Sequence, residues 1–83
     1  MALRFYKYEH MTCDCPDKEI FAQQCKALED YIPDLVKGVL LHYEDDTEIQ
    51  CYTLYGADVV VENDYDLGGV FVRSNISIRQ YFP

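Results

Sequence analysis

Apolar and polar residues alternate along the first part of the chain and then change to a helical spacing. Over residues 3–8 the alternation has a period of two, which is typical of a half-buried strand. From Pro16 the apolar residues recur at helical spacing, and Pro33 ends this stretch because proline disfavours helical geometry in the residue before it. The helical stripe consists of Ile20, Phe21, Cys25, Leu28, Tyr31 and Ile32. We therefore expect a strand over 3–8, irregular backbone over 10–15 and a helix over 16–31.

From Gly38 onward, short β-branched or alternating runs are separated by polar or glycine-containing turns. The expected strands are 39–43, 48–55, 59–62 and 70–73, with a last one over 76–82 after a tight turn at 74–75. In the second of these strands we expect the odd-numbered side chains, including Cys51, to face the core. The fold class is therefore predicted as α+β: an antiparallel sheet of about five to six strands in the order β-α-β-β-β-β-β, with one helix packed on one face.

The size of the chain limits what it can build. Its 83 residues suffice for one hydrophobic core, so 1–83 is expected to form a single domain. A core this small leaves little room for a deep cofactor pocket, which argues against an enzyme. No apolar run approaches the ~20 residues of a membrane span, and no signal-peptide stretch opens the chain. We expect a cytoplasmic protein without membrane contact, in the bacterial host if it is phage-encoded.

Negative charge is concentrated where most of the strands are expected. The formal net charge is −8, and no Lys or Arg occurs between Lys37 and Arg73. Eight of the 15 acidic residues lie in that stretch: Glu44, Asp45, Asp46, Glu48, Asp58, Glu62, Asp64 and Asp66. Outside it, acidic and basic residues balance. Direct nucleic-acid binding is not expected, because phosphates require Lys and Arg.

An acidic sheet of this kind can imitate the phosphates of a nucleic acid. Carboxylates on alternate strand residues, such as Glu62, Asp64 and Asp66, would stand ~6–7 Å apart. A cationic groove attracts such a row at long range, and tyrosines supply anchoring contacts. The candidate partner-binding residues are Glu44, Asp45, Asp46, Glu48, Tyr52, Asp58, Glu62, Asp64, Tyr65 and Asp66. The alternative is a solvated face that only keeps a small protein soluble.

Four residues near the N-terminus are candidate metal ligands: His10, Cys13, Cys15 and Cys25. Zinc sites usually pair cysteines separated by about two to four residues, whereas one residue separates Cys13 from Cys15, and Cys25 belongs to the helical stripe. A redox pair at Cys13 and Cys15 has no second catalytic group in a recognisable setting. We therefore expect these cysteines and Cys51 to be buried structural thiols, with no metal and no cofactor.

The sequence matches neither a calcium-binding loop nor a known catalytic motif well. Residues 62–69 superficially resemble a calcium loop, but the glycine falls one place late and Arg73 occupies the position of the last acidic ligand. The two histidines, His10 and His42, accompany no nucleophile motif and no phosphate-binding glycine loop. The sequence therefore predicts no catalytic set.

The overall layout resembles small acidic phage-encoded inhibitors, above all the uracil-DNA glycosylase inhibitor family. The likeness lies in Val39-Leu40-Leu41-His42 before an acidic turn and in Val70-Phe71-Val72-Arg73-Ser74-Asn75 before the expected closing strand. The family's Glu-Ser-Ile core has a faint counterpart in Lys18-Glu19-Ile20, which lies in the expected helix. The resemblance implies a mode of action, in which an acidic protein plugs the DNA-binding site of a host enzyme. Anti-CRISPR and anti-restriction proteins belong to the same physical class. No functional residue is carried over.

Three functions remain as alternatives. The first is a non-catalytic inhibitor from a phage or mobile element that binds the basic nucleic-acid-binding site of a host defence or DNA-processing enzyme. The second is an immunity protein or antitoxin that neutralises one cognate toxin. The third is a small metal-binding or redox protein that uses His10, Cys13, Cys15 and Cys25. A homodimer formed through an exposed edge strand, at 3–8 or at the C-terminal strand, is also open.

Overall fold

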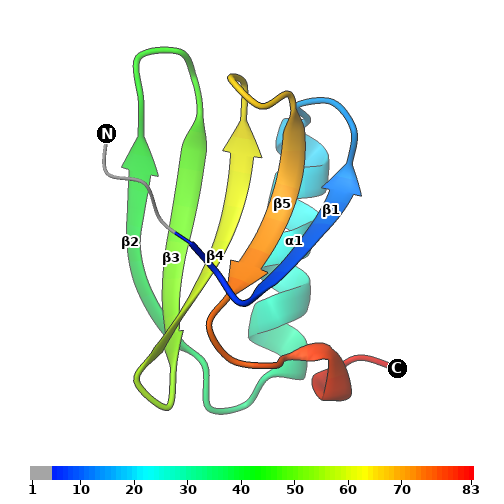
Figure 1. Ribbon diagram of the computed structural model, residues 1–83, viewed down its shortest axis with the longest axis vertical. Helices are drawn as coiled ribbons and strands as arrows, with labels where there is room; N and C mark the ends of the chain where they lie inside the picture. Colours follow the sequence, from blue (N-terminus) through cyan, green and yellow to red (C-terminus); the bar gives the residue numbers. More distant parts are fainter. Residues whose placement is uncertain (1–4) are drawn as a thin grey trace.

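Five strands, an α-helix and a 3-10 turn make up residues 5–83, the part of the chain that the computed structural model describes (Figure 1). In chain order they are β1 (Tyr8–Cys13), α1 (Lys18–Tyr31), β2 (Val36–His42), β3 (Glu48–Leu54), β4 (Ala57–Asp64), β5 (Gly69–Ser74) and η1 (Arg79–Tyr81). The strands form one antiparallel sheet in the order β1-β5-β4-β3-β2, and α1 lies behind it in Figure 1. The predicted α+β fold is confirmed.

The helix begins at a side-chain cap. Asp17 Oδ1 accepts the backbone N–H groups of Glu19 and Ile20, at 2.9 and 3.0 Å, and so satisfies two donors that the first helical turn leaves unpaired. Pro16 therefore lies before the helix and not at its first position, whereas the end before Pro33 is as expected. No helix in residues 5–83 has the length and apolar character needed to cross a membrane.

The core lies between α1 and one face of the sheet. Its buried members are Phe21, Leu28 and Ile32 with Tyr52, Leu54, Val59, Val61, Val70 and Val72. In β3 the even-numbered side chains therefore face the helix, and the expected orientation of Cys51 is wrong: Cys51 lies on the helix-free face beside Val60. The error has a simple cause, since apolar side chains occupy both faces of β3 and the alternation alone does not select one.

The first strand forms later in the chain than expected. β1 covers Tyr8–Cys13 and pairs with β5, for example Tyr8 with Ser74, so it occupies the segment that was expected to be irregular. Residues 1–4 lie outside the described residues, and 5–7 precede the strand. β1 is a sheet edge and most of its side chains are exposed, so no buried alternation marks it in the sequence.

The predicted last strand is wrong, and the sheet has five strands. Ser74 Oγ donates to the Ile76 carbonyl at 2.7 Å as the chain leaves β5, and the segment then forms η1. Its apolar side chains pack against the end of the core, where the Phe82 and Tyr31 rings lie 5.6 Å apart. The alternating apolar residues of this segment therefore cover the core as part of an irregular tail and not as part of a strand.

Candidate functional site

Three connections, taken together with the strand residues that border them, lie at one end of the sheet: residues 13–17 from the end of β1 to the N-cap of α1, 43–48 from β2 to the first residue of β3, and 64–68 from the last residue of β4 to β5. Figure 1 shows all three at the upper end, with the β3–β4 turn at the lower end. The backbone N–H of Tyr65 donates to Thr47 Oγ1 at 3.0 Å, which joins the last two connections directly. The backbone N–H of Asp17 donates to Asn63 Oδ1 at 2.9 Å and ties the first connection to β4.

These three segments, which we call the acidic end, contain no Lys or Arg. They contain eight carboxylates: Asp14, Asp17, Glu44, Asp45, Asp46, Glu48, Asp64 and Asp66. His42 at the end of β2 lies 3.6 Å from Asp46 and 3.9 Å from Glu48. The antiparallel fold thus gathers at one end the charges that the sequence spreads over three distant segments.

Some of these carboxylates stabilise the turns that carry them. Asp45 Oδ1 accepts the backbone N–H of Thr47 at 3.0 Å, and Asp64 Oδ1 accepts those of Asp66 and Leu67 at 2.9 and 2.8 Å. Short acidic side chains commonly hold turns in this way. Asp17 likewise caps α1. By contrast, the exposed carboxylates of Asp14, Glu44 and Asp66 take no part in these caps.

Seven of the ten predicted partner-binding residues lie at the acidic end: Glu44, Asp45, Asp46, Glu48, Asp64, Tyr65 and Asp66. Asp58 is exposed but lies near the β3–β4 turn at the opposite end. The predicted row of alternate carboxylates does not form, because β4 ends at Asp64 and Asp66 belongs to the turn. Asp14 was missed, since it lies outside the stretch that lacks basic residues in the sequence.

Tyr52 is wrong as a surface contact. Its side chain is 1% exposed, and its hydroxyl donates to Glu29 Oε2 at 2.6 Å across the sheet–helix interface. That hydrogen bond, together with Lys37 Nζ at 3.3 Å, lowers the pKa of Glu29. Burial and the same hydrogen bond raise the pKa of Tyr52, and burial raises the pKa of the neighbouring Cys25 thiol. Tyr52 and Cys25 therefore stay protonated at neutral pH and belong to the core.

Glu62 is also wrong as a surface contact. It is 6% exposed and pairs with Arg73, whose Nη1 lies 2.6 Å from Glu62 Oε1. Arg73 Nε reaches Glu9 Oε2 at 3.0 Å, and the guanidinium lies over the Phe71 ring at 4.5 Å. Burial raises the pKa of Glu62 and outweighs the opposing effect of Arg73. This ion-pair cluster lies on the helix-free face and holds β1, β4 and β5 together.

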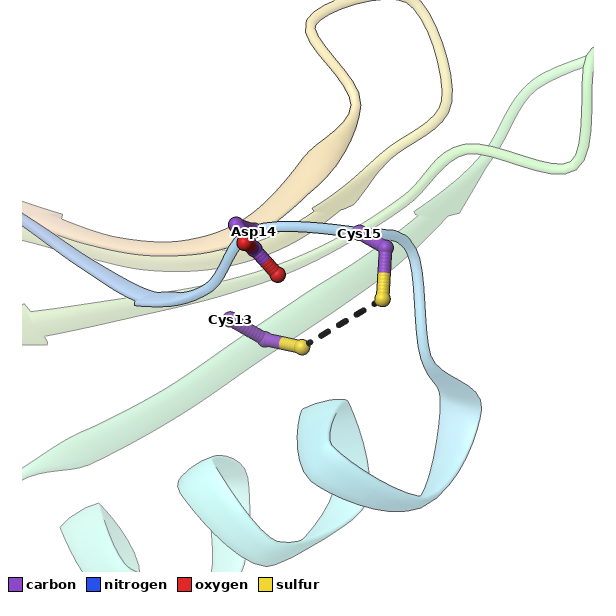
Figure 2. A group of neighbouring side chains, drawn as sticks. All are labelled: Cys13, Asp14 and Cys15. Atoms are coloured by element: carbon purple, nitrogen blue, oxygen red, sulfur yellow. Dashed lines mark hydrogen bonds between the residues drawn. The ribbon is translucent and has the colours of Figure 1, made fainter.

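The four candidate metal ligands His10, Cys13, Cys15 and Cys25 do not come together. Cys25 lies on α1 beside Tyr52, and His10 lies in the middle of β1, where it pairs with Val72 of β5. Cys13 and Cys15 do meet, with their sulfurs 3.7 Å apart, and Asp14 lies between them (Figure 2). Cys15 is exposed, and Cys13 together with the charges of Asp14 and Asp17 raises the pKa of its thiol.

The sheet edges are β1 and β2. Of the two segments proposed as dimer edges, 3–8 contributes Tyr8 to β1, although its residues 3–4 lie outside the described residues, and the C-terminal segment forms η1 instead of a strand. Every residue of β2 is exposed, and Val36, Val39 and Leu40 are each more than half exposed. Lys37 and an irregular pairing register between Lys37 and Leu40 interrupt this edge. Charged residues and bulges of this kind discourage edge-to-edge pairing.

No family model, curated protein or solved structure matches this chain. We therefore infer function from the chain's own side chains, beginning with the eight carboxylates of the acidic end.

Proposed function

We propose that the protein is a non-catalytic inhibitor, from a phage or mobile element, whose acidic end binds the basic nucleic-acid-binding site of a host defence or DNA-processing enzyme. One observation carries the proposal. Eight carboxylates from three segments far apart in the chain lie at one end of the sheet, and these segments contain no Lys or Arg. A cationic groove evolved to hold phosphates would attract such a surface at long range.

Turn formation does not account for all of these charges. Asp45, Asp64 and Asp17 hold backbone N–H groups, and neutral Asn or Ser would do the same. Asp14, Glu44 and Asp66 add negative charge to a place that is already negative. Crowded like charges destabilise a fold, so a binding role explains them better than solubility, which mixed charges serve equally well.

Two titratable groups that belong to the core, Cys25 and Tyr52, support a non-catalytic role. A nucleophilic cysteine needs a lowered pKa, whereas burial raises that of Cys25. Tyr52 is held as a hydrogen-bond donor to Glu29, with its pKa raised. Neither group is poised to exchange a proton near neutral pH.

A matched pair of variants tests the proposal. In the first, Asp14→Asn, Glu44→Gln and Asp66→Asn remove three charges from the acidic end. In the second, Asp30→Asn, Asp34→Asn and Asp58→Asn remove three exposed charges elsewhere. Both variants and the wild type are immobilised and exposed to bacterial lysate at low and high salt. We expect the wild type and the second variant to retain a nucleic-acid-binding enzyme at low salt, and the first to lose it.

Added duplex or single-stranded DNA should then compete with the immobilised protein for the captured enzyme. If both triple variants retain the enzyme equally, or if DNA does not compete, the acidic end is not the contact and the proposal fails. Retention of a single secreted or plasmid-encoded nuclease toxin would instead identify the protein as an immunity protein.

A further inference from the structure

The connection between β1 and α1 brings three potential metal ligands together. Figure 2 shows the sulfurs of Cys13 and Cys15 converging beside the first turn of α1, with the Asp14 carboxylate directed to the same side of the loop. The two sulfurs are 3.7 Å apart, and one ligand atom from each of the three residues lies within 4.8 Å of the others. Among the described residues, this is the one group of three His, Cys, Asp or Glu side chains with such spacing.

We propose that Cys13, Asp14 and Cys15 bind a thiophilic divalent cation of the zinc class, with a further coordination position open to solvent. Zinc binds thiolate sulfur at about 2.3 Å in tetrahedral geometry, which places two sulfur ligands roughly 3.8 Å apart. The observed separation of 3.7 Å matches that spacing without movement of the backbone. The carboxylate of Asp14 completes the set by rotation about its side-chain bonds.

Local charge favours a cation at this pair. Asp14 and Asp17 flank the two cysteines in the chain, and Cys13–Asp17 forms part of the acidic end. A divalent cation would offset the charge of these carboxylates, and thiolate is the form of cysteine that binds it.

The structure also explains why the unusual spacing of Cys13 and Cys15 does not exclude a metal site. Closed structural zinc sites use four ligands, commonly from two paired-cysteine turns. Cys25 and His10 are held elsewhere by the core and by β1, so the four-ligand set cannot form. Three protein ligands with an open position need only one loop, and the single-residue gap brings both sulfurs to one side of it. Cys15 is exposed, which gives a cation access from solvent.

The test uses purified full-length chain, reduced with a phosphine and freed of metal. Titration with Co²⁺ and Cd²⁺ should give thiolate-to-metal charge-transfer bands, and Co²⁺ should add tetrahedral ligand-field bands, each saturating at one ion per chain. Zn²⁺ should displace Co²⁺. Asp14→Asn should weaken binding by at least about tenfold, the lower end of the loss seen when even an outer-shell partner of a metal site is removed.

Cys13→Ser and Cys15→Ser should each abolish the charge-transfer bands, whereas Cys25→Ser and Cys51→Ser should leave them unchanged. Circular dichroism of each variant reports whether it folds, and Asp14→Asn tests the site with both thiols in place. Absence of the bands in the wild type, or their loss in Cys25→Ser but not in Cys13→Ser, overturns the proposal. So does a pair that binds no ion yet exchanges with a small-molecule disulfide, forming the Cys13–Cys15 disulfide and releasing two small thiols. None of these readouts involves the protein partner proposed above, so either proposal can fail alone.

Discussion

Two tyrosine hydroxyls differ in burial but make nearly the same hydrogen bond. Tyr52 donates to Glu29 at 2.6 Å from within the core, and Tyr55 donates to Asp34 at 2.7 Å on the surface. Water replaces a lost surface bond easily, whereas a core position excludes it. We therefore expect the hydrogen bond of Tyr52 to contribute more to the stability of the fold than the hydrogen bond of Tyr55.

We expect Tyr52→Phe to lower the free energy of unfolding by about 1 kcal/mol and Tyr55→Phe to lower it by clearly less. The first value stays modest because Glu29 is partly exposed and regains water. Urea denaturation of the two variants at neutral pH measures both. Equal losses would show that burial does not set the strength of these bonds.

The contribution of the Tyr52–Glu29 hydrogen bond to stability should also depend on pH. The pKa of Glu29 is lowered in the folded protein, chiefly by the Tyr52 hydroxyl. A carboxyl of this kind contributes stability above its unfolded pKa, about 4.3, and loses that contribution as the pH falls through the lower folded value. The stability difference between wild type and Tyr52→Phe should therefore be constant near neutrality and shrink below about pH 4. Denaturation curves across that range provide the measurement, and a difference that grows on acidification would contradict it.

Among the elements, the helix was predictable because its signals are local. Its periodicity, the acidic first turn and Pro33 all lie within the segment itself. The strands depend on partners elsewhere. β1 owes its place to the free edge of β5, and the orientation of β3 to which face α1 covers. Residues 76–82 alternate like a strand, but the chain turns away from the sheet after Ser74. No local sequence pattern predicts this turn. The sequence therefore predicts the helix and the approximate places of β2, β3, β4 and β5, but it misses the place of β1, the orientation of β3 and the course of the tail, which depend on distant partners.

The side-chain cap that Asp17 provides for α1 should contribute measurably to the stability of the protein. Asp17→Ala should lower the free energy of unfolding by about 1 kcal/mol, because two backbone N–H groups lose their acceptor. Asp17→Asn keeps an acceptor at the same place and should cost little, although it removes the same charge. Thermal or urea unfolding of the pair distinguishes the cap from the charge: equal losses in both variants would mean that charge, not the hydrogen bonds, is what matters at Asp17.

For the whole molecule, the candidate site was partly predictable from topology. Successive turns of an antiparallel meander alternate between the two ends of the sheet, so the turns at 44–46 and 65–68 share one end and 55–56 lies at the other. Applied to the sequence, this rule separates Asp58 from the acidic end. It does not reveal Asp14, because the place of β1 beside β5 is a long-range pairing. Nor does it reveal the burial of Glu62, which depends on Arg73.

The crowded carboxylates of the acidic end should lower the free energy of unfolding even in the absence of a partner. If its carboxylates share one field, Asp14→Asn, Glu44→Gln and Asp66→Asn together should raise the free energy of unfolding by up to about 1 kcal/mol at low salt, because like charges no longer repel. The gain should vanish near 1 M salt, where screening acts within about 3 Å.

The triple variant Asp30→Asn, Asp34→Asn and Asp58→Asn changes net charge equally but should bring no such gain, since it also removes the Lys26–Asp30 ion pair and the charge that Tyr55 contacts. Urea unfolding of both variants at the two salt concentrations separates net charge from local crowding. Equal gains would show that overall charge alone is responsible. A gain confined to the acidic end would mean that the fold retains a repulsive surface at a cost in stability, which is the expected state of a surface completed by a basic partner.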